Sequence, residues 1–87
     1  MIEISRYPFL IGKLEEEMDC IIDRPSVSRM HARISENTRS PQDSCYIVDL
    51  NSTNGTYING TRIEPYQKKL VNTGDVIRLA DQEFILR

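Results

Sequence analysis

The chain has 87 residues, of which 39% are hydrophobic and 28% charged, a composition typical of a globular protein with one small core. Its net charge of −2 argues against nucleic acid as a partner, because a phosphate backbone favours proteins with a basic stripe. No apolar run is long enough to cross a bilayer, so we expect no contact with a membrane either.

The amino-terminal residues and the cysteines bear on the cellular compartment. Residues 1–6 alternate apolar with polar side chains and lack the basic and then apolar build of a secretory signal, so we expect a cytoplasmic protein. Cys20 and Cys45 could form a disulfide in an oxidising compartment. Each lies in an apolar run, however, where a free Cys behaves as a small hydrophobe, and we expect two buried thiols. With one His and two distant Cys, the sequence predicts no metal site and no cofactor.

Taken in chain order, the apolar residues predict short strands. Residues 2–4 alternate in strand fashion, and the apolar run 9–11 ends at Gly12. The acidic segment 15–19 has no apolar periodicity and is predicted to be a solvated loop, with one helical turn as the alternative. Further strands are predicted at 20–22, 31–35, 45–50, 57–58, 61–63, 69–71, 76–79 and 83–86. This pattern predicts an all-β fold, a sandwich of two sheets in preference to a small barrel.

Two Asn-Gly pairs predict tight turns between strands, because both residues accept positive φ readily. Asn59-Gly60 predicts a two-residue hairpin. Asn54-Gly55 lies in the polar run 52–56, which is also predicted to be a hairpin tip. Two hydroxyl side chains precede this pair and a third follows it, so the tip could present several hydrogen-bonding groups to a ligand.

Several short motifs follow one another in an order that resembles a forkhead-associated (FHA) domain of the bacterial type. They are Gly12-Lys13, the SRMHA run at 28–32, Asp49-Leu50, the STNGT run at 52–56, Asn59-Gly60 and the LVNTGDVIRL run at 70–79. The match extends from about Gly12 to the carboxyl terminus. The resemblance implies a sandwich of two antiparallel sheets whose loops, gathered at one end, bind a phosphothreonine-containing peptide.

The sequence departs from the family pattern at two places. The family usually has Arg after the glycine, whereas this chain has Lys13, a flexible point charge instead of a planar fork for two phosphate oxygens. The family also usually begins with one more strand before the one predicted at 2–4. We therefore expect residues 1–87 to be a single FHA domain from a longer protein, with the first family strand missing.

The resemblance implies a binding role for five residues. Ser28 and Thr53 would donate hydroxyl hydrogen bonds to the phosphate, and Lys13 would supply positive charge. Arg29 would offer charge to the phosphate or to the peptide backbone, and Asn54 would hold the peptide main chain. The alternatives are structural: the two hydroxyls could cap turns, Arg29 could be a solvated surface residue, and Asn54 could serve the turn alone.

Gly12, His31 and Gly55 are expected to support the site, with His31 bracing the binding loops by hydrogen bonds as it does in the family. His31 follows Ser28 by three residues, which invites comparison with a serine hydrolase. A nucleophile also needs a base oriented by a third group, and a GxSxG nucleophile elbow is absent. We therefore expect no enzymatic activity.

The function implied is that of a phosphothreonine-peptide-binding module in Ser/Thr-kinase-linked signalling, monomeric as an isolated domain. The alternative is an FHA-fold domain that binds its partner without phosphate, because Lys13 replaces the usual Arg. Lys13 and two hydroxyl residues in an acidic protein favour the phosphate-binding function, since a local positive charge in such a protein indicates an anionic ligand.

Overall fold

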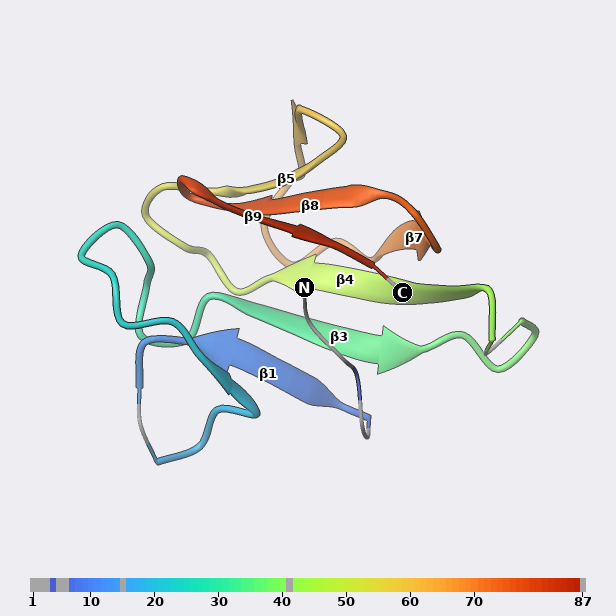
Figure 1. Ribbon diagram of the computed structural model, residues 1–87, viewed down its shortest axis with the longest axis horizontal. Coiled ribbons are helices and arrows are strands. Elements are labelled where there is room, and N and C mark those ends of the chain that lie inside the picture. Colours follow the sequence, from blue (N-terminus) through green and yellow to red (C-terminus); the bar gives the residue numbers. More distant parts are fainter. Residues whose placement is uncertain (1–3, 5–6, 15, 41, 87) are drawn as a thin grey trace.

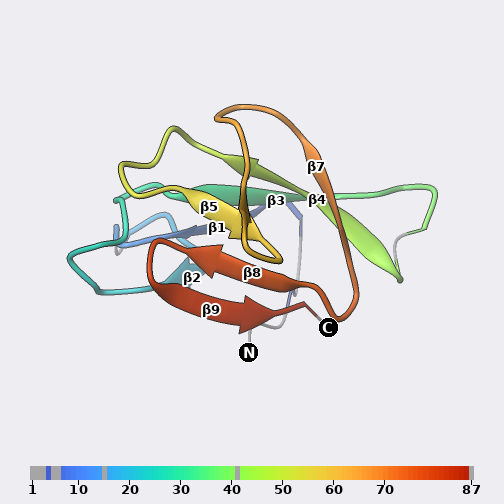
Figure 2. The ribbon, with the colours of Figure 1, turned by 90° about the horizontal axis from the view of Figure 1, so that it is seen from above.

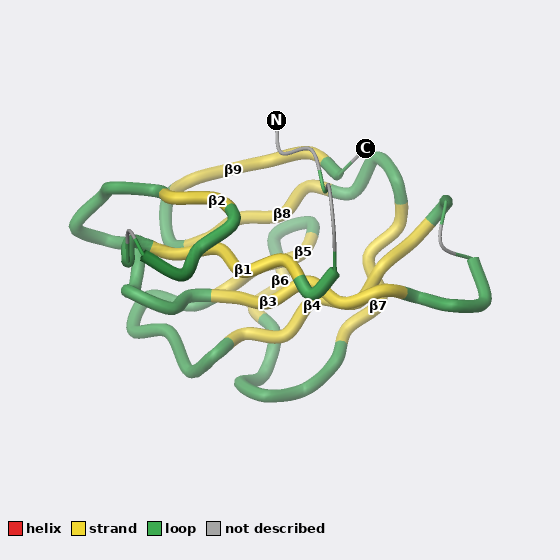
Figure 3. The backbone as a smooth tube through the Cα atoms, turned by 90° about the horizontal axis from the view of Figure 1, so that it is seen from below, coloured by secondary structure: helices red, strands yellow, loops and turns green. Residues whose placement is uncertain are grey.

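The computed structural model describes residues 4, 7–14, 16–40 and 42–86 of the chain. Over these residues the chain forms strands and no helix, as the tube in Figure 3 shows, and this confirms the predicted all-β fold. The strands in chain order are β1 (Phe9–Gly12), β2 (Cys20–Ile21), β3 (Ala32–Glu36), β4 (Ser44–Asp49), β5 (Thr56–Ile58), β6 (Thr61–Arg62), β7 (Lys69–Asn72), β8 (Val76–Leu79) and β9 (Gln82–Ile85).

Two sheets form the predicted sandwich (Figure 1). One sheet has the strand order β2-β1-β3-β4-β7 and the other has the order β6-β5-β8-β9. Paired strands run antiparallel, except that β1 and the two-residue β2 pair in parallel at one edge. Of the strand predicted at 2–4, residues 2 and 3 lie outside the described residues, and Ile4 belongs to no strand.

The core lies between the two sheets, and in strands such as β3 and β8 alternate side chains are buried in it. In β3, for example, Ala32 and Ile34 are buried while Arg33 between them is exposed. Ile34 lies opposite Ile47 of β4, and both are almost fully buried. Burying an aliphatic side chain of this size contributes roughly 1.5–3 kcal/mol. The core cluster consists of Phe9, Ile11, Ala32, Ile34, Cys45, Ile47, Ile63, Val71, Ile77, Leu79 and Leu86.

The prediction of a hairpin at 52–56 is wrong, because this segment connects one sheet to the other. β4 lies in the five-stranded sheet and β5 in the four-stranded sheet. Gly55 has a φ of 88°, but Asn54 is not among the residues with positive φ, so the pair does not form the expected turn. The hairpin predicted at Asn59-Gly60 is confirmed: it joins β5 to β6, and the two residues have φ angles of 50° and 86°.

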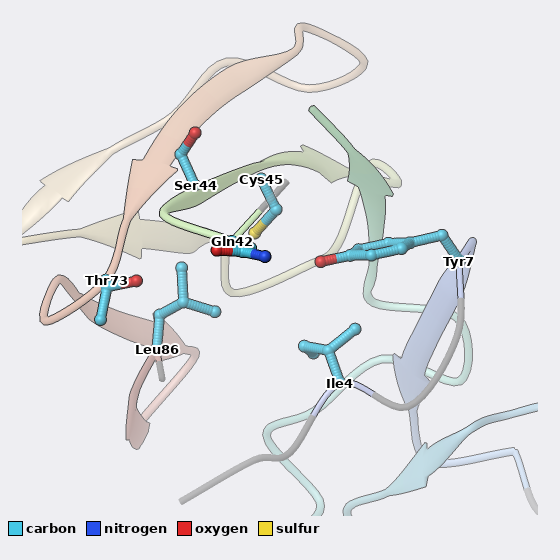
Figure 4. A pocket seen from close by; sticks show the side chains of 7 residues that line it. All are labelled: Ile4, Tyr7, Gln42, Ser44, Cys45, Thr73 and Leu86. Atoms are coloured by element: carbon cyan, nitrogen blue, oxygen red, sulfur yellow. The ribbon is translucent and has the colours of Figure 1, made fainter. Parts of the chain in front are cut away.

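The two cysteines are free, as predicted, although Cys20 is only partly buried. Cys45 lies beside a small pocket of about 20 Å³ (Figure 4), toward which the Tyr7 hydroxyl points. Burial raises the pKa of the Cys45 thiol to about 11. A space of this size holds about one water molecule, so it is a packing gap and not a ligand site.

The polar loops that carry the predicted site lie together at the other end of the sandwich. They follow the end of β1, precede β3 and follow the end of β4, and the β8–β9 turn lies close to them (Figure 2). Antiparallel strands place these ends at one edge, because β3 begins where β1 and β4 finish. The sandwich therefore gathers loops from distant parts of the sequence on one rigid support.

Candidate functional site

The loop end of the sandwich contains an open pocket of about 380 Å³. All five residues predicted to bind a ligand line it, and three further residues, all preceding Ser28, complete the wall. The lining consists of Lys13, Pro25, Ser26, Val27, Ser28, Arg29, Thr53 and Asn54. Residues 25–27 were not predicted to line the pocket, because the sequence of a polar loop does not indicate which of its side chains point toward a neighbouring loop.

Gly12 allows two backbone segments to approach each other below this pocket. The Lys13 N–H donates to the Ser28 carbonyl oxygen at 3.0 Å, and the Leu14 N–H donates to the Arg29 carbonyl oxygen at 3.1 Å. A Cβ atom at Gly12 would collide with the backbone of Arg29. Only glycine therefore permits the pairing that places Lys13 beside the Ser28 loop.

His31 links the two loops that form the pocket. Its side chain is fully buried. The Nδ1 atom accepts a hydrogen bond from the Ser28 backbone N–H at 3.1 Å, and Nε2 lies 2.9 Å from the Gly55 carbonyl oxygen. With Nδ1 acting as the acceptor, the proton belongs on Nε2, which donates to that oxygen. A neutral imidazole satisfies both partners at once.

The environment of His31 favours this neutral form. Burial lowers the pKa of His31 below its usual value, against smaller opposing effects of the hydrogen bond to Gly55 and of the Asp49 charge. Its Nδ1 contacts the backbone of Ser28 and not the hydroxyl. The geometry that a serine nucleophile needs from its base is thus absent from this pair.

Backbone and side-chain hydrogen bonds also join the Ser28 and Thr53 loops directly. The Thr53 N–H donates to Ser28 Oγ at 3.0 Å. Because that bond uses Oγ as an acceptor, the hydroxyl proton of Ser28 is left to donate elsewhere. Asn54 Nδ2 donates to the Ser26 carbonyl oxygen at 2.7 Å, while the exposed Thr53 side chain has no hydrogen bond to another described residue.

The three hydroxyls of the run 52–56 do not all face outward, so the expectation that they form one ligand-presenting tip is wrong. Ser52 and Thr56 are buried and donate to Asp49 Oδ1 at 2.6 and 2.7 Å. Asp49 Oδ2 accepts the Ser52 N–H at 3.1 Å, and Ser52 Oγ accepts the Gly55 N–H at 3.0 Å. These charge-assisted bonds fix the loop shape and leave Thr53 and Asn54 exposed.

Asp49 and Asp81 are two acidic residues whose roles the sequence did not reveal. Asp49 ends an apolar strand, and hydroxyl residues follow it three and seven positions later. This pattern could have indicated that its carboxylate accepts hydrogen bonds from the loop. Asp81 lies in the β8–β9 turn and accepts a hydrogen bond from Ser26 Oγ at 2.5 Å. This bond, together with one from Gln82, lowers the pKa of the Asp81 carboxyl. No pattern in the sequence connects Asp81 with Ser26.

The charges of the pocket suit an anion. Lys13 and Arg29 both line it, and neither forms an ion pair with a carboxylate of the described residues. Two uncompensated cations next to two hydroxyl groups make a site for a multiply charged oxyanion. No three metal-ligating side chains converge anywhere in the part of the chain that the structure describes. The fold and the site thus define a β-sandwich module whose loops enclose a pocket lined by two cations and by hydroxyl side chains.

The amino-acid sequence matches the model of a known protein family. The family model of the FHA domain matches residues 9–80, so the chain belongs to the FHA domain family. The resemblance stated from its motifs is confirmed, and a bacterial FHA domain, from Chlamydia trachomatis, is among its structural neighbours. FHA domains are interaction modules and not enzymes.

Individual relatives show how far the similarity reaches. Human kanadaptin is 38% identical over 76 residues, which cover 79% of this chain and 10% of kanadaptin. The structure of Mycobacterium tuberculosis EmbR in complex with a low affinity phosphopeptide superposes with a TM-score of 0.79 at 34% identity, covering 94% of this chain and 20% of that one. A structure from a study of phosphothreonine-dependent FHA domain interactions also has a TM-score of 0.79, with 30% identity and coverage of 97% and 79%. The chain spans about a tenth to a quarter of the length of the first curated relatives it matches.

Proposed function

We propose that this FHA domain binds phosphothreonine-containing peptides in the pocket between its loops. The observation that carries the proposal is the convergence of Lys13, Ser28, Arg29, Thr53 and Asn54 in that pocket. A phosphothreonine side chain has a charge of about −1.5 to −2 near neutral pH and three acceptor oxygens. Two cations and two hydroxyl donors complement both properties.

The hydrogen bonds of the free domain support specific roles for the two hydroxyls. Ser28 Oγ already accepts from the Thr53 N–H, so it meets the phosphate as a donor. The Thr53 hydroxyl makes no bond to a described residue and is exposed, so it donates without losing an internal partner. Donors fixed in this way need little reorganisation when the ligand arrives, and this lowers the entropic cost of binding.

Asn54 is suited to hold the main chain of the peptide. One hydrogen of its Nδ2 is used in the bond to the Ser26 carbonyl oxygen, which orients the amide at the rim of the pocket. Its carbonyl oxygen and second amide hydrogen are available to a peptide backbone that runs past the phosphate. The structural role of Asn54 and its binding role are therefore compatible.

The alternative function, binding without phosphate because Lys13 replaces Arg, is not favoured. Arg29 lines the same pocket, so the planar fork that Lys13 lacks is still present in the site. Phosphopeptides also occur in the structures of relatives: EmbR was solved with one at 34% identity to this chain.

The proposal is tested by selecting a ligand from a degenerate phosphothreonine peptide library and titrating it, with its unphosphorylated twin, into the domain and its variants. Ser28→Ala and Thr53→Ala each remove one hydrogen bond to a charged group, worth roughly 1.5–3 kcal/mol, and should weaken binding roughly tenfold to hundredfold. Thr38→Ala is the matched control, since Thr38 is an exposed threonine outside the pocket. Equal affinities of Thr53→Ala, Thr38→Ala and wild type would contradict the assigned role of Thr53.

We also propose the wider setting of this activity. The domain is part of a longer protein, since its curated relatives are several times longer. Within that protein it acts as a monomeric module in Ser/Thr-kinase-linked signalling in the cytoplasm. The described residues include no apolar helix of membrane-spanning length. Size-exclusion chromatography with light scattering tests the monomeric state, and fractionation of cells that express the full-length protein tests the compartment.

A further inference from the structure

A second groove lies along the side of the sandwich, away from the phosphate pocket. β6 is an edge strand of one sheet and β7 is an edge strand of the other. A groove of about 280 Å³ lies where these edges meet, and its lining shares no residue with the loop pocket. The β6–β7 groove is lined by Ile58, Thr61, Arg62, Ile63, Glu64, Lys69 and Leu70.

The groove combines an apolar floor with a charged rim. Ile63 is buried and Ile58 is partly buried, whereas Leu70 is 48% exposed at one wall. A half-exposed leucine beside one buried and one partly buried isoleucine leaves room for another aliphatic side chain to cover it. Arg62 and Lys69 stand at the rim, and neither pairs with a carboxylate of the described residues.

One wall of the groove also offers backbone hydrogen-bonding groups. Among the described strands β7 pairs only with β4. On its other side Asn72 is already bonded to Asp75, through its N–H at 2.8 Å and its carbonyl oxygen at 3.0 Å, so the open part of this edge is the backbone at Leu70. Such an edge can accept an extended segment as an additional strand. Side chains of that segment would then alternate between the groove and the solvent.

The connection from β6 to β7 is held in place before any partner binds. The Ile63 N–H donates to the Thr56 carbonyl oxygen at 2.9 Å, and the Tyr66 N–H donates to the Asp49 carbonyl oxygen at 2.9 Å. Tyr66 is 69% exposed and has a φ of 64°, a backbone conformation that a bulky residue seldom adopts. The groove therefore has a preorganised wall, which reduces the cost of binding.

We propose that the β6–β7 groove binds an extended, unphosphorylated segment of a partner protein, in which one large aliphatic residue is flanked by Asp or Glu. The aliphatic side chain covers Leu70 and the floor at Ile63, and the acidic residues face Arg62 and Lys69. The two cations outnumber Glu64 at the rim, although the domain as a whole has a net charge of −2. This local positive charge gives the complementarity that selects an acidic segment.

Selection from a displayed library of random unphosphorylated peptides tests this proposal. The enriched peptides are titrated against wild-type domain, Leu70→Asp, Lys69→Glu and the matched control Ile85→Asp, which alters an exposed aliphatic residue of β9 outside the groove. We expect enrichment of an aliphatic residue between acidic ones. Leu70→Asp should weaken binding about tenfold or more, whereas Ile85→Asp should bind as wild type. Lys69→Glu should regain affinity when one acidic residue of the peptide is replaced by Lys.

Three results would overturn the proposal. A library without enrichment, or enrichment of peptides that lack the aliphatic and acidic pattern, means that the groove has no such ligand. Equal affinity of Leu70→Asp and wild type places the peptide elsewhere. Loss of binding in Lys13→Ala, with Leu70→Asp unaffected, places it in the loop pocket. Phosphothreonine binding by the loops is measured separately, so its presence or absence does not affect this outcome.

Discussion

Removing the imidazole of His31 is the change whose effect can be worked out most fully. The buried ring accepts the Ser28 N–H at Nδ1 and donates from Nε2 to the Gly55 carbonyl oxygen. His31→Ala leaves both backbone groups without these partners, at a cost of roughly 1–3 kcal/mol for each. The expected loss is about 2 to 6 kcal/mol, a large part of the roughly 5–15 kcal/mol by which a domain is stable.

A loss of this size is measured readily by thermal unfolding followed by circular dichroism. For a domain of 60–100 residues, 1 kcal/mol corresponds to roughly 4–8 °C, so His31→Ala should lower Tm by at least about 8 °C. Phosphopeptide affinity should fall as well, because the ring links the two loops of the pocket.

Two variants control for this result. His31→Asn keeps a short acceptor for the Ser28 N–H but cannot reach Gly55, so its Tm should lie between those of His31→Ala and wild type. Arg33→Ala changes an exposed residue of β3, two positions after His31, and should have little effect. A His31→Ala protein whose unfolding free energy lies within about 0.5 kcal/mol of wild type, the range of neutral surface changes, would refute the bracing role.

Three further predictions concern pH, charge and the support of the loops. Burial holds the pKa of His31 below its usual value of about 6.5. The contribution of the neutral imidazole to stability is therefore complete above about pH 6.5 and is lost as the pH falls toward the pKa of the folded state. Urea titrations at several pH values should show this loss in wild type and not in His31→Asn. In isothermal titration, Lys13→Ala should abolish most phosphopeptide binding and Lys13→Arg should preserve or strengthen it. Unchanged affinity in both variants would show that Lys13 does not contribute to phosphopeptide binding. Asp49→Asn places an amide where a carboxylate accepts from Ser52 and Thr56, so it should cost roughly 1–3 kcal/mol in urea unfolding; a neutral effect would show that the carboxylate does not organise the loop.

Much of the fold could be predicted from sequence because strand patterns and turn chemistry are local. The alternation at 76–79 and the Asn59-Gly60 pair specify β8 and the β5–β6 hairpin with residues that are neighbours in the chain. The sheet to which a strand belongs is not a local property. The residues of the run 52–56 therefore predict a hairpin, although the segment crosses from one sheet to the other.

In the candidate site, the sequence predicted five of the lining residues but not how their side chains are oriented. Its five predicted residues came from motifs in sequence order, and they do line one pocket. The direction of each side chain depends on partners that are distant in sequence: Ser52 turns inward because Asp49 is there to accept its proton. The bond from Ser26 to Asp81 joins residues 55 positions apart and becomes visible only in three dimensions.

The NMR spectrum of the 15N-labelled domain, recorded during titration, tests whether the loop pocket binds phosphothreonine. A selected phosphothreonine peptide and its unphosphorylated twin are added in separate experiments. We predict that the phosphorylated peptide shifts the amide signals of residues 12–14, 26–31 and 52–55, which surround the pocket, and that the twin leaves them unchanged. Equal shifts with both peptides, or shifts confined to residues outside these loops, would contradict the claim.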